Sequence, residues 1–356
     1  MGEKILAALS GGVDSSVCAA LLQKEGYDVE GMILRMHDAG LSKADIVNGK
    51  LSPAIKMARD ISRKLHINFS VEDVRGRFDE LVVKNFVEAY ENNITPNPCI
   101  FCNRHFKFAE ILRVADEKGI EKVATGHYAK AEYDSSRKRY IIKKAADETK
   151  DQSYMLYQLT QEQLSRVVLP LGQYAKLDIR KKAKELGFKN YNAVDSQDIC
   201  FIPDGDYGKF IVEKTGHVPE PGNFVDTKGN VLGRHEGLLY YTIGQRKGLG
   251  LSLAEPMYVK EKRQAENEVV LCRKEELFTD EVWAENINFV AADHVTDGMP
   301  VAAKIRYSQN EAKGKAEIRD GILKVKFDEP VRAATPGQSM VLYEDDTILL
   351  GGIIIK

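Results

Sequence analysis

Residue types that bind phosphate are concentrated in the stretch SGGVDSS, residues 10–16. An apolar run at residues 5–9 precedes it and predicts a buried strand, and the apolar spacing after it predicts a helix. Because Gly11 and Gly12 carry no Cβ, a ligand can approach the backbone, and the first helical N–H groups can bind an anion. Serine hydroxyls add donors, and Asp14 offers oxygen ligands for Mg²⁺. The stretch therefore predicts a phosphate-binding loop.

This loop is not one of the common phosphate-binding motifs. It lacks the GxxxxGK[ST] pattern with its lysine, and it is not GxGxxG. It resembles the pyrophosphatase loop (PP-loop) of enzymes that cleave ATP between the α- and β-phosphates and adenylate a substrate. The structural alternative is a glycine–serine turn before a helix.

Thiols form the second group of reactive residues. Pro96 and Pro98 predict that residues 93–100 form a rigid non-helical loop. Asn103 is a residue type that can cap the helix that follows. Cys102 would then lie just before a helix N-terminus, where the helix dipole lowers the pKa of a thiol. Cys200 lies much later in the chain, in a polar loop of its own.

Not every cysteine is expected to be reactive. A buried apolar thiol is the alternative for both Cys102 and Cys200. Cys18 lies on the apolar side of the first predicted helix and Cys272 in an apolar strand, so both are expected in the core. Five cysteines, an odd number, favour free, catalytic or metal-bound thiols over a disulfide framework.

The composition is that of an ordinary globular protein. The chain has 356 residues, 43% hydrophobic and 29% charged, which is enough for two or three domains. Since the net charge is −2, a nucleic-acid partner must meet a local basic patch. Residues 180–184 offer such a patch, with a solvated helix face as the alternative. We expect a cytoplasmic protein with no membrane segment, because no run approaches ~18 uninterrupted apolar residues.

Strands and helices alternate over the first 130 residues. Strands are expected at residues 5–9, 29–36, 69–74 and 122–125, and helices from Pro53 with Ser52 as N-cap, at 78–90 and at 106–115. This alternation predicts a parallel sheet with helices on both faces, in which ligands bind at the carboxyl ends of the strands. The phosphate-binding loop and Gly126–His127 follow two of these strands, so we expect them to share a pocket.

The rest of the chain is expected to become progressively β-rich. A hairpin is predicted at residues 132–144, a capping box at Thr160 and Gln163, and a basic helix that ends at Gly187. Beyond about residue 205 short strands take over, and Asp320–Gly321 is a strong hairpin signal. We expect domains at 1–205, 206–275 and 276–356, the second small and β-rich and the third a β-barrel.

Seven motifs occur in order along the whole chain: SGGVDSS, TPNP..CN..FKF, ATGHYA, KDQSYMLY, DSQDICFI, TIGQRKGLG and TPGQSMVLY. Together they resemble the bacterial tRNA-specific 2-thiouridylases, the MnmA family. The resemblance implies an α/β + β fold: an adenine-nucleotide α-hydrolase-like PP-loop ATPase domain, a central β-rich domain and a tRNA-contacting C-terminal β-barrel. It also implies adenylation, with ATP and Mg²⁺, of the 2-oxo group of the wobble uridine in tRNAs for Lys, Glu and Gln. A persulfide, supplied by a donor or relay protein, then delivers the sulfur that replaces this oxygen.

The resemblance assigns roles by position. Cys102 would be the nucleophile and Cys200 the persulfide carrier, the two forming a disulfide in turnover. The implied ATP-binding residues are Ala8, Leu9, Ser10, Gly11, Gly12, Val13, Asp14, Ser15, Leu34 and Gly126. The implied tRNA-binding residues are Asn97, Pro98, Cys99, His127, Lys150, Asp151, Gln152, Arg306, Tyr307 and Gln338.

One position departs from the family pattern. The family usually has Asp where this chain has Cys99, which creates a Cys-x-x-Cys pair with Cys102. One hypothesis is that Cys102 and Cys200 work as a persulfide–disulfide pair. The other is that all three thiols hold an iron–sulfur cluster with one open iron. Zinc is disfavoured, because three ligands with no clear fourth do not make a closed site.

Two further functions compete with thiolation. Another adenylating enzyme, such as an NAD or argininosuccinate synthetase, would share the loop but needs neither the paired cysteines nor the barrel. A non-catalytic RNA-binding module with a vestigial nucleotide loop is the second alternative. ATP–pyrophosphate exchange that depends on tRNA would separate all three.

Overall fold

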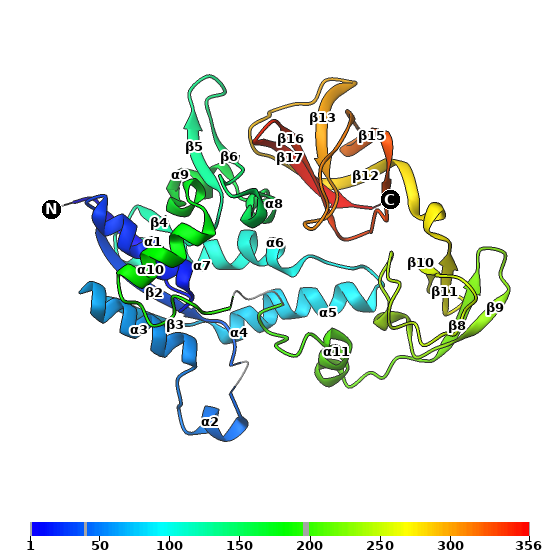
Figure 1. Ribbon diagram of the computed structural model, residues 1–356, viewed down its shortest axis with the longest axis horizontal. Helices are drawn as coiled ribbons and strands as arrows, with labels where there is room; N and C mark the ends of the chain where they lie inside the picture. The colour runs from blue at the N-terminus through cyan, green and yellow to red at the C-terminus, as the bar shows by residue number, and fades with distance from the viewer. Residues whose placement is uncertain (1, 39–40, 195–198, 356) are drawn as a thin grey trace.

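The computed structural model describes residues 2–38, 41–194 and 199–355. An α/β unit built from the N-terminal part lies at one end of the molecule, and two β-rich units lie at the other (Figure 1). Residues 195–198, which are the DSQD part of the DSQDICFI motif, lie outside the described residues.

A five-stranded parallel sheet forms the centre of the α/β unit, as the alternation of strands and helices predicts. Its order is β3-β2-β1-β4-β7. The strands are β1 (Lys4–Ala8), β2 (Asp28–Arg35), β3 (Phe69–Asp73), β4 (Lys122–Ala124) and β7 (Val167–Val168). Because β1 lies between β2 and β4, its carboxyl end is the point at which the strand order reverses, where doubly wound sheets bind ligands. The phosphate-binding loop follows β1.

Helices cover both faces of this sheet. Alternation along β1 sends Leu6 into one core, and Ile5 and Ala7 into the other. The Leu6 core takes residues from α7 (Phe108–Glu117), α8 (Ser153–Leu156) and α9 (Gln161–Arg166), and the opposite core from α1 (Val13–Lys24), α3 (Pro53–Leu65) and α10 (Lys176–Glu185). The predicted caps are confirmed, since Ser52 accepts from the Ile55 N–H and Thr160 forms its capping box with Gln163.

Two helical stretches contain a π turn each. The first is α4 (Arg75–Phe78), η1 (Asp79–Val83) and α5 (Lys84–Glu91), and the second is α6 (Pro98–Cys102), η2 (Asn103–Lys107) and α7. The prediction that residues 93–100 stay non-helical and that Asn103 caps the helix is wrong. Asn97 is the N-cap, and its side chain accepts from the Ile100 N–H. Pro98 occupies the first helical position, where its missing N–H costs nothing.

The central unit is built on a four-stranded sheet of order β10-β11-β8-β9. Its strands are β8 (Gly222–Asp226), β9 (Val231–His235), β10 (Tyr258–Arg263) and β11 (Glu268–Cys272). Helix α11 (Tyr207–Thr215) precedes it, and its Ile211 packs in an aromatic cluster with Phe78, Phe86 and Phe201. The remaining helical segments are α2 (Lys43–Val47), η3 (Glu148–Lys150), η4 (Pro170–Gln173), η5 (Leu238–Tyr240) and η6 (Lys274–Leu277).

Six C-terminal strands close into the predicted barrel through pairing of its first and last strands. They are β12 (Phe278–Phe289), β13 (Met299–Lys304), β14 (Ala312–Arg319), β15 (Ile322–Arg332), β16 (Ser339–Glu344) and β17 (Thr347–Ile354). Asp320 and Gly321 both have positive φ, at 50° and 77°, as a two-residue hairpin turn with this sequence requires.

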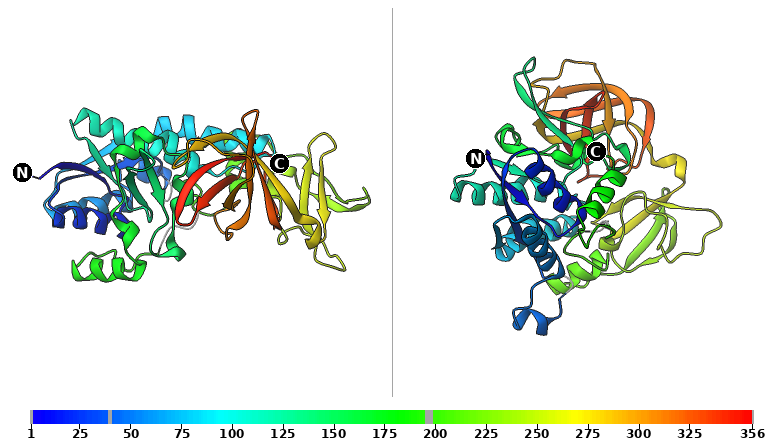
Figure 2. Two further views of the ribbon diagram at one scale, coloured as in Figure 1. Left: turned by 90° about the horizontal axis from the view of Figure 1, so that it is seen from above. Right: turned by 60° about the vertical axis from the view of Figure 1, so that its left-hand side comes forward.

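The hairpin of β5 (Lys130–Asp134) and β6 (Arg139–Lys143) extends the barrel sheet, which the sequence does not predict. Thr347 of β17 pairs with Lys143 of β6, and both views of Figure 2 place the hairpin against the barrel. The Leu6 core continues through Ile142 into Tyr343 and Ile348 of the barrel. The nucleotide-loop unit and the barrel therefore share one hydrophobic core.

Among the described residues, no helix is both long and apolar enough to cross a membrane.

Candidate nucleotide and cysteine sites

The phosphate-binding loop is braced by hydrogen bonds from its own serine side chains to its backbone. The Ser15 hydroxyl accepts from the Ser10 N–H at 3.0 Å and donates to the Gly12 carbonyl at 3.1 Å. Gly11 has a φ of 79°, and a Cβ there would lie 2.5 Å from the Ala54 carbonyl oxygen, so this position requires glycine. Gly12 caps α1 without a side-chain hydrogen bond. Because glycine has no side chain, Gly12 offers no cap to the first N–H groups of α1, and these groups can bind an anion.

Gly126 lies directly against this loop. A Cβ on Gly126 would be 2.8 Å from the Ser15 backbone nitrogen. The predicted proximity of the two strand ends is therefore confirmed. Leu34, the second-last residue of β2, packs against the Leu6 core and against the aromatic cluster of Phe78, Phe86 and Phe201.

The Asp14 carboxylate has three hydrogen bonds from other side chains. The Lys176 ammonium donates to Asp14 Oδ1 at 2.8 Å and Oδ2 at 2.7 Å, and the Tyr128 hydroxyl donates to Oδ1 at 2.7 Å. A Mg²⁺ ion at Asp14 would have to displace at least the ammonium from these oxygens. Sequence reasoning missed both Lys176 and Tyr128. The only signal was that the loop itself has no lysine, so that a lysine from another part of the chain could take that place.

Asn190 is a second side chain that sequence reasoning missed. Its amide nitrogen donates to the Gly11 carbonyl at 2.9 Å and to the Ser16 hydroxyl at 3.1 Å. Its Oδ1 is buried and has no hydrogen-bond partner among the described residues. A buried acceptor without a partner costs free energy, and a group bound at the loop could supply the missing donor.

Cys102 lies at the end of α6 and is 7% exposed, within the same cluster as Phe106 and Phe201. Burial raises the pKa of its thiol, and the Lys107 charge and backbone N–H oppose that rise. The prediction that the pKa of Cys102 is lowered is therefore wrong, because burial has the largest effect and raises it. Since α6 begins at Pro98, Cys102 lies past the helix N-terminus rather than before it, and the helix dipole gives it no help.

Cys200 is exposed and follows the segment that the structure does not describe. The protein around its thiol nevertheless raises its pKa by desolvation, Lys107 lowers it, and negative charge on Cys102 or Cys99 would raise it further. The three thiols thus lie within electrostatic reach of one another. All five cysteines are free thiols, and Cys18 and Cys272 are each 1% exposed, as predicted for core residues.

The thiols do not form a ligand set in the described part of the chain. No three His, Cys, Asp or Glu side chains among the described residues gather closely enough to hold a metal ion. Cys99 and Cys102 lie three residues apart on α6, so they share a helix face.

The loop that leads into α6 is docked on the barrel through Thr95 and Pro96. The Gln338 amide donates to the Thr95 carbonyl at 2.9 Å and to the Pro96 carbonyl at 3.3 Å. A cavity of about 280 Å³ lies at this junction. It is lined by Thr95, Thr242, Arg306, Tyr307, Ser308, Thr335 and Gln338. Three of the residues predicted to bind tRNA therefore line one cavity.

The residues from Lys150 to Gln152 connect this junction to the nucleotide loop. The Tyr307 hydroxyl donates to the Asp151 carbonyl at 3.1 Å. Gln152 exchanges two hydrogen bonds with the backbone of Tyr128, the neighbour of His127. His127 stacks on Phe108, and burial, followed by the Lys107 charge, lowers its pKa to about 3. The segments that carry the predicted tRNA-binding positions are thus joined by hydrogen bonds.

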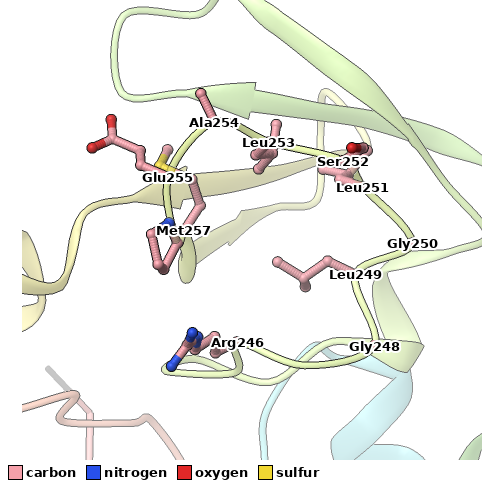
Figure 3. A pocket seen from close by; sticks show the side chains of 11 residues that line it. Arg246, Gly248, Leu249, Gly250, Leu251, Ser252, Leu253, Ala254, Glu255 and Met257 are labelled. Carbon is pink, nitrogen blue, oxygen red and sulfur yellow. The ribbon is translucent and has the colours of Figure 1, made fainter.

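A cavity of about 730 Å³ lies in the central unit, and none of the predicted site residues lines it. Its wall is the segment of residues 246–257, which overlaps the TIGQRKGLG motif. Figure 3 shows Leu249, Leu251 and Leu253 along this curved segment, with Arg246 at one end.

Comparison with known proteins covers the whole chain. Three family models match it: the tRNA methyl transferase HUP domain at residues 3–204, the tRNA methyl transferase PRC-barrel domain at 209–273 and the aminomethyltransferase beta-barrel domain at 279–355. The tRNA-specific 2-thiouridylase MnmA of Acetivibrio thermocellus is 46% identical over 356 residues, covering 99% of both chains. A tRNA-specific 2-thiouridylase MnmA of Clostridium botulinum is 47% identical and covers 100% of both. A solved 4-thiouridine synthetase–RNA complex with bound ATP has a TM-score of 0.36 at 18% identity, covering 60% of this chain and 50% of that chain.

Proposed function

The chain belongs to the family of tRNA-specific 2-thiouridylases, and on that premise we propose that it adenylates the 2-oxo group of a tRNA uridine and replaces that oxygen with sulfur. The observation that carries the proposal is the match at 46% identity over 99% of both chains. The PP-loop at the carboxyl end of β1, with Gly126 against it, supplies an ATP site of the required kind.

Adenylation comes first. The uridine O2 attacks the α-phosphorus of ATP, a P–O bond forms, and pyrophosphate leaves. The N–H groups at the start of α1 and the Ser10 hydroxyl would hold the phosphate oxygens. Mg²⁺ would neutralise charge on the phosphates, and Asp14 is the loop carboxylate available to it. The target base must leave the anticodon stack to reach this site.

Sulfur transfer follows. The terminal sulfur of a Cys200 persulfide attacks C2 of the adenylated uridine, and AMP leaves. The Cys102 thiolate then attacks the Cys200 sulfur, the bond from Cys200 to the transferred sulfur breaks, and 2-thiouridine is released. The enzyme is left with a Cys102–Cys200 disulfide, which an external dithiol reduces. The exposure of Cys200 suits loading by a persulfide donor or relay protein.

The second candidate mechanism uses an iron–sulfur cluster on Cys99, Cys102 and Cys200. The presence of Cys99 where the family has Asp favours it. The arrangement of the described residues disfavours it, because these thiols do not form a group that could hold a metal ion. We therefore derive no step through a cluster.

The tRNA would be held at the junction of the loop near Asn97 with the barrel. Lys150, Asp151, Gln152, Arg306, Tyr307 and Gln338 lie on the segments that meet there. We propose the tRNAs for Lys, Glu and Gln as substrates and the cytoplasm as the site of action.

Nucleoside mass spectrometry of tRNA from cells lacking this chain tests the proposal. 2-Thiouridine should be absent, return with the intact gene, and stay absent with the Cys200→Ser gene. Undiminished 2-thiouridine in the deletion strain, with no second copy of the gene present, would refute the proposal. Pyrophosphate exchange without tRNA would instead favour another adenylating enzyme.

A further inference from the structure

A lysine from far along the chain enters the phosphate-binding loop. Lys176, the first residue of α10, places its ammonium 2.7 Å from Asp14 Oδ2 and 2.8 Å from Asp14 Oδ1. The residue is only 6% exposed, and its ammonium lies 5.5 Å from the centre of the Tyr128 ring. The ion pair therefore sits at the first turn of α1, where the phosphates of a nucleotide would bind.

Stability alone does not explain a charge pair at this place. The free energy lost when two charges are taken out of water is about as large as the free energy gained from their attraction. Proteins in which apolar side chains of similar size replace such a pair are often at least as stable. The loop also lacks the lysine that common phosphate-binding loops carry next to their glycines. A buried lysine that reaches the same turn from α10 can supply that missing positive charge.

We propose that Lys176 is the residue that binds the β- and γ-phosphates of ATP, and that Asp14 holds it in place until a nucleotide arrives. This inference rests on the proposed function. When Mg²⁺ enters with ATP, it competes with the ammonium for the two Asp14 oxygens. The ammonium then exchanges the carboxylate for phosphate oxygens. Both partners keep a counter-charge throughout, so the exchange leaves no buried charge uncompensated.

The proposal makes a prediction that separates nucleotides. AMP has no β- or γ-phosphate, so its binding should not depend on Lys176. A lysine that only neutralises Asp14 and anchors α10 would affect ATP and AMP equally, because its loss would disturb the whole loop. A fall in the ratio of the ATP affinity to the AMP affinity would therefore indicate that Lys176 contacts the β- and γ-phosphates. A purely structural role of the lysine would leave this ratio unchanged.

Isothermal titration of the full chain with ATP or AMP, in the presence of Mg²⁺, is the experiment. Lys176→Met should weaken ATP binding by roughly ten- to a hundredfold, as expected for a lost charge-assisted hydrogen bond, and AMP binding by less than about twofold. Lys176→Arg should retain most of the ATP affinity. Lys24→Met, an exposed lysine in the last turn of α1, is the matched control and should change neither affinity. Equal losses for ATP and AMP, or no loss for either, would overturn the proposal.

A second comparison guards against misfolding of the single variant. Asp14→Asn and the double variant Asp14→Asn with Lys176→Met are titrated with EDTA present, so that neither magnesium nor the Asp14 carboxylate contributes. The double variant should have the lower ATP-to-AMP affinity ratio, by tenfold or more. Equal ratios would refute the role of Lys176 while leaving the proposed function intact. Wild-type chain that binds neither nucleotide, even with tRNA present, would refute the proposed function itself.

Discussion

The Gln338 side chain donates a 2.9 Å hydrogen bond to the Thr95 carbonyl and thereby ties the barrel to the loop that leads into α6. The two residues lie 243 positions apart in the chain. Gly337 packs so closely on this loop that a Cβ would lie 2.3 Å from Ile94 Cγ2. The barrel therefore positions the segment that begins with Asn97 and ends at Cys102.

Gln338→Ala should release this loop without unfolding the barrel. We expect faster amide hydrogen exchange at residues 94–99, a several-fold loss of thiolation, and a loss of about 1 kcal/mol in the free energy of unfolding. Gln309→Ala is the matched control, because that amide also donates to a backbone carbonyl, that of Arg332, away from the loop. Unchanged exchange at residues 94–99 in Gln338→Ala would contradict the tether.

The cysteines should divide into two classes. Cys102→Ser and Cys200→Ser should abolish 2-thiouridine formation but leave the adenylated tRNA intermediate detectable, because neither thiol is part of the phosphate-binding loop. Cys18→Ser and Cys272→Ser should retain thiolation and lose about 1 kcal/mol of stability, since both side chains are in the core. A Cys200→Ser enzyme that still forms 2-thiouridine would exclude the two-cysteine mechanism.

The Lys107 charge should set the pH at which Cys102 becomes reactive. Burial raises the pKa of Cys102, and Lys107 lowers it. The alkylation rate of Cys102 by iodoacetamide, followed by mass spectrometry, should therefore rise with pH above the usual thiol range. Lys107→Met should shift this profile to still higher pH, whereas Lys107→Arg should leave it close to wild type. A Lys107→Met profile at or below the wild-type one would show that the ammonium does not act on this thiol.

His127 should make the fold less stable in mild acid. Its folded-state pKa is about 3, below the usual value of 6.5, so the unfolded chain binds a proton that the folded chain does not. This contribution is fully present above pH 6.5 and is lost as the pH falls from 6.5 toward 3. Urea unfolding at pH 7.5, 6.5 and 5.5 should show a decline that His127→Gln reduces. An identical decline in that variant would assign the effect to other groups.

Protein purified without oxygen should decide between the two sulfur carriers. We expect iron-free, colourless protein that thiolates tRNA from a persulfide donor, and we expect Cys99→Asp, the residue usual in the family, to remain active. Iron quantification and visible absorption are the measurements. About four irons per chain, with the absorption lost in Cys99→Ala, would establish the cluster mechanism instead.

Local sequence signals predicted much of this structure. The alternation of strands and helices over the first 130 residues, the Ser52 and Thr160 caps, the Asp320–Gly321 turn and the core positions of Cys18 and Cys272 are all confirmed. Each depends on interactions within a few residues or on simple burial periodicity. The motif set likewise identified the family that the whole-chain comparison establishes.

One local prediction failed because two readings of the same residues compete. Proline disfavours a helix in its interior but favours the first position, and the sequence around Pro98 does not distinguish the two. The structure starts α6 at Pro98, which moves Cys102 from before a helix to its last turn. The expected effect of the helix dipole on that thiol disappears with this shift, and burial dominates its pKa.

The amino-acid sequence by itself identified the family and predicted a phosphate-binding loop and two catalytic cysteines, because glycines, hydroxyls and thiols at fixed spacing carry those signals locally. Only the tertiary structure decided what surrounds them. Lys176 reaches Asp14 from 162 residues away, and Gln338 reaches Thr95 from 243 residues away. Neither pairing leaves a trace in local spacing, since both arise from how sheets and helices pack around a shared core. The charge at the loop and the position of the cysteine helix are therefore properties of the fold.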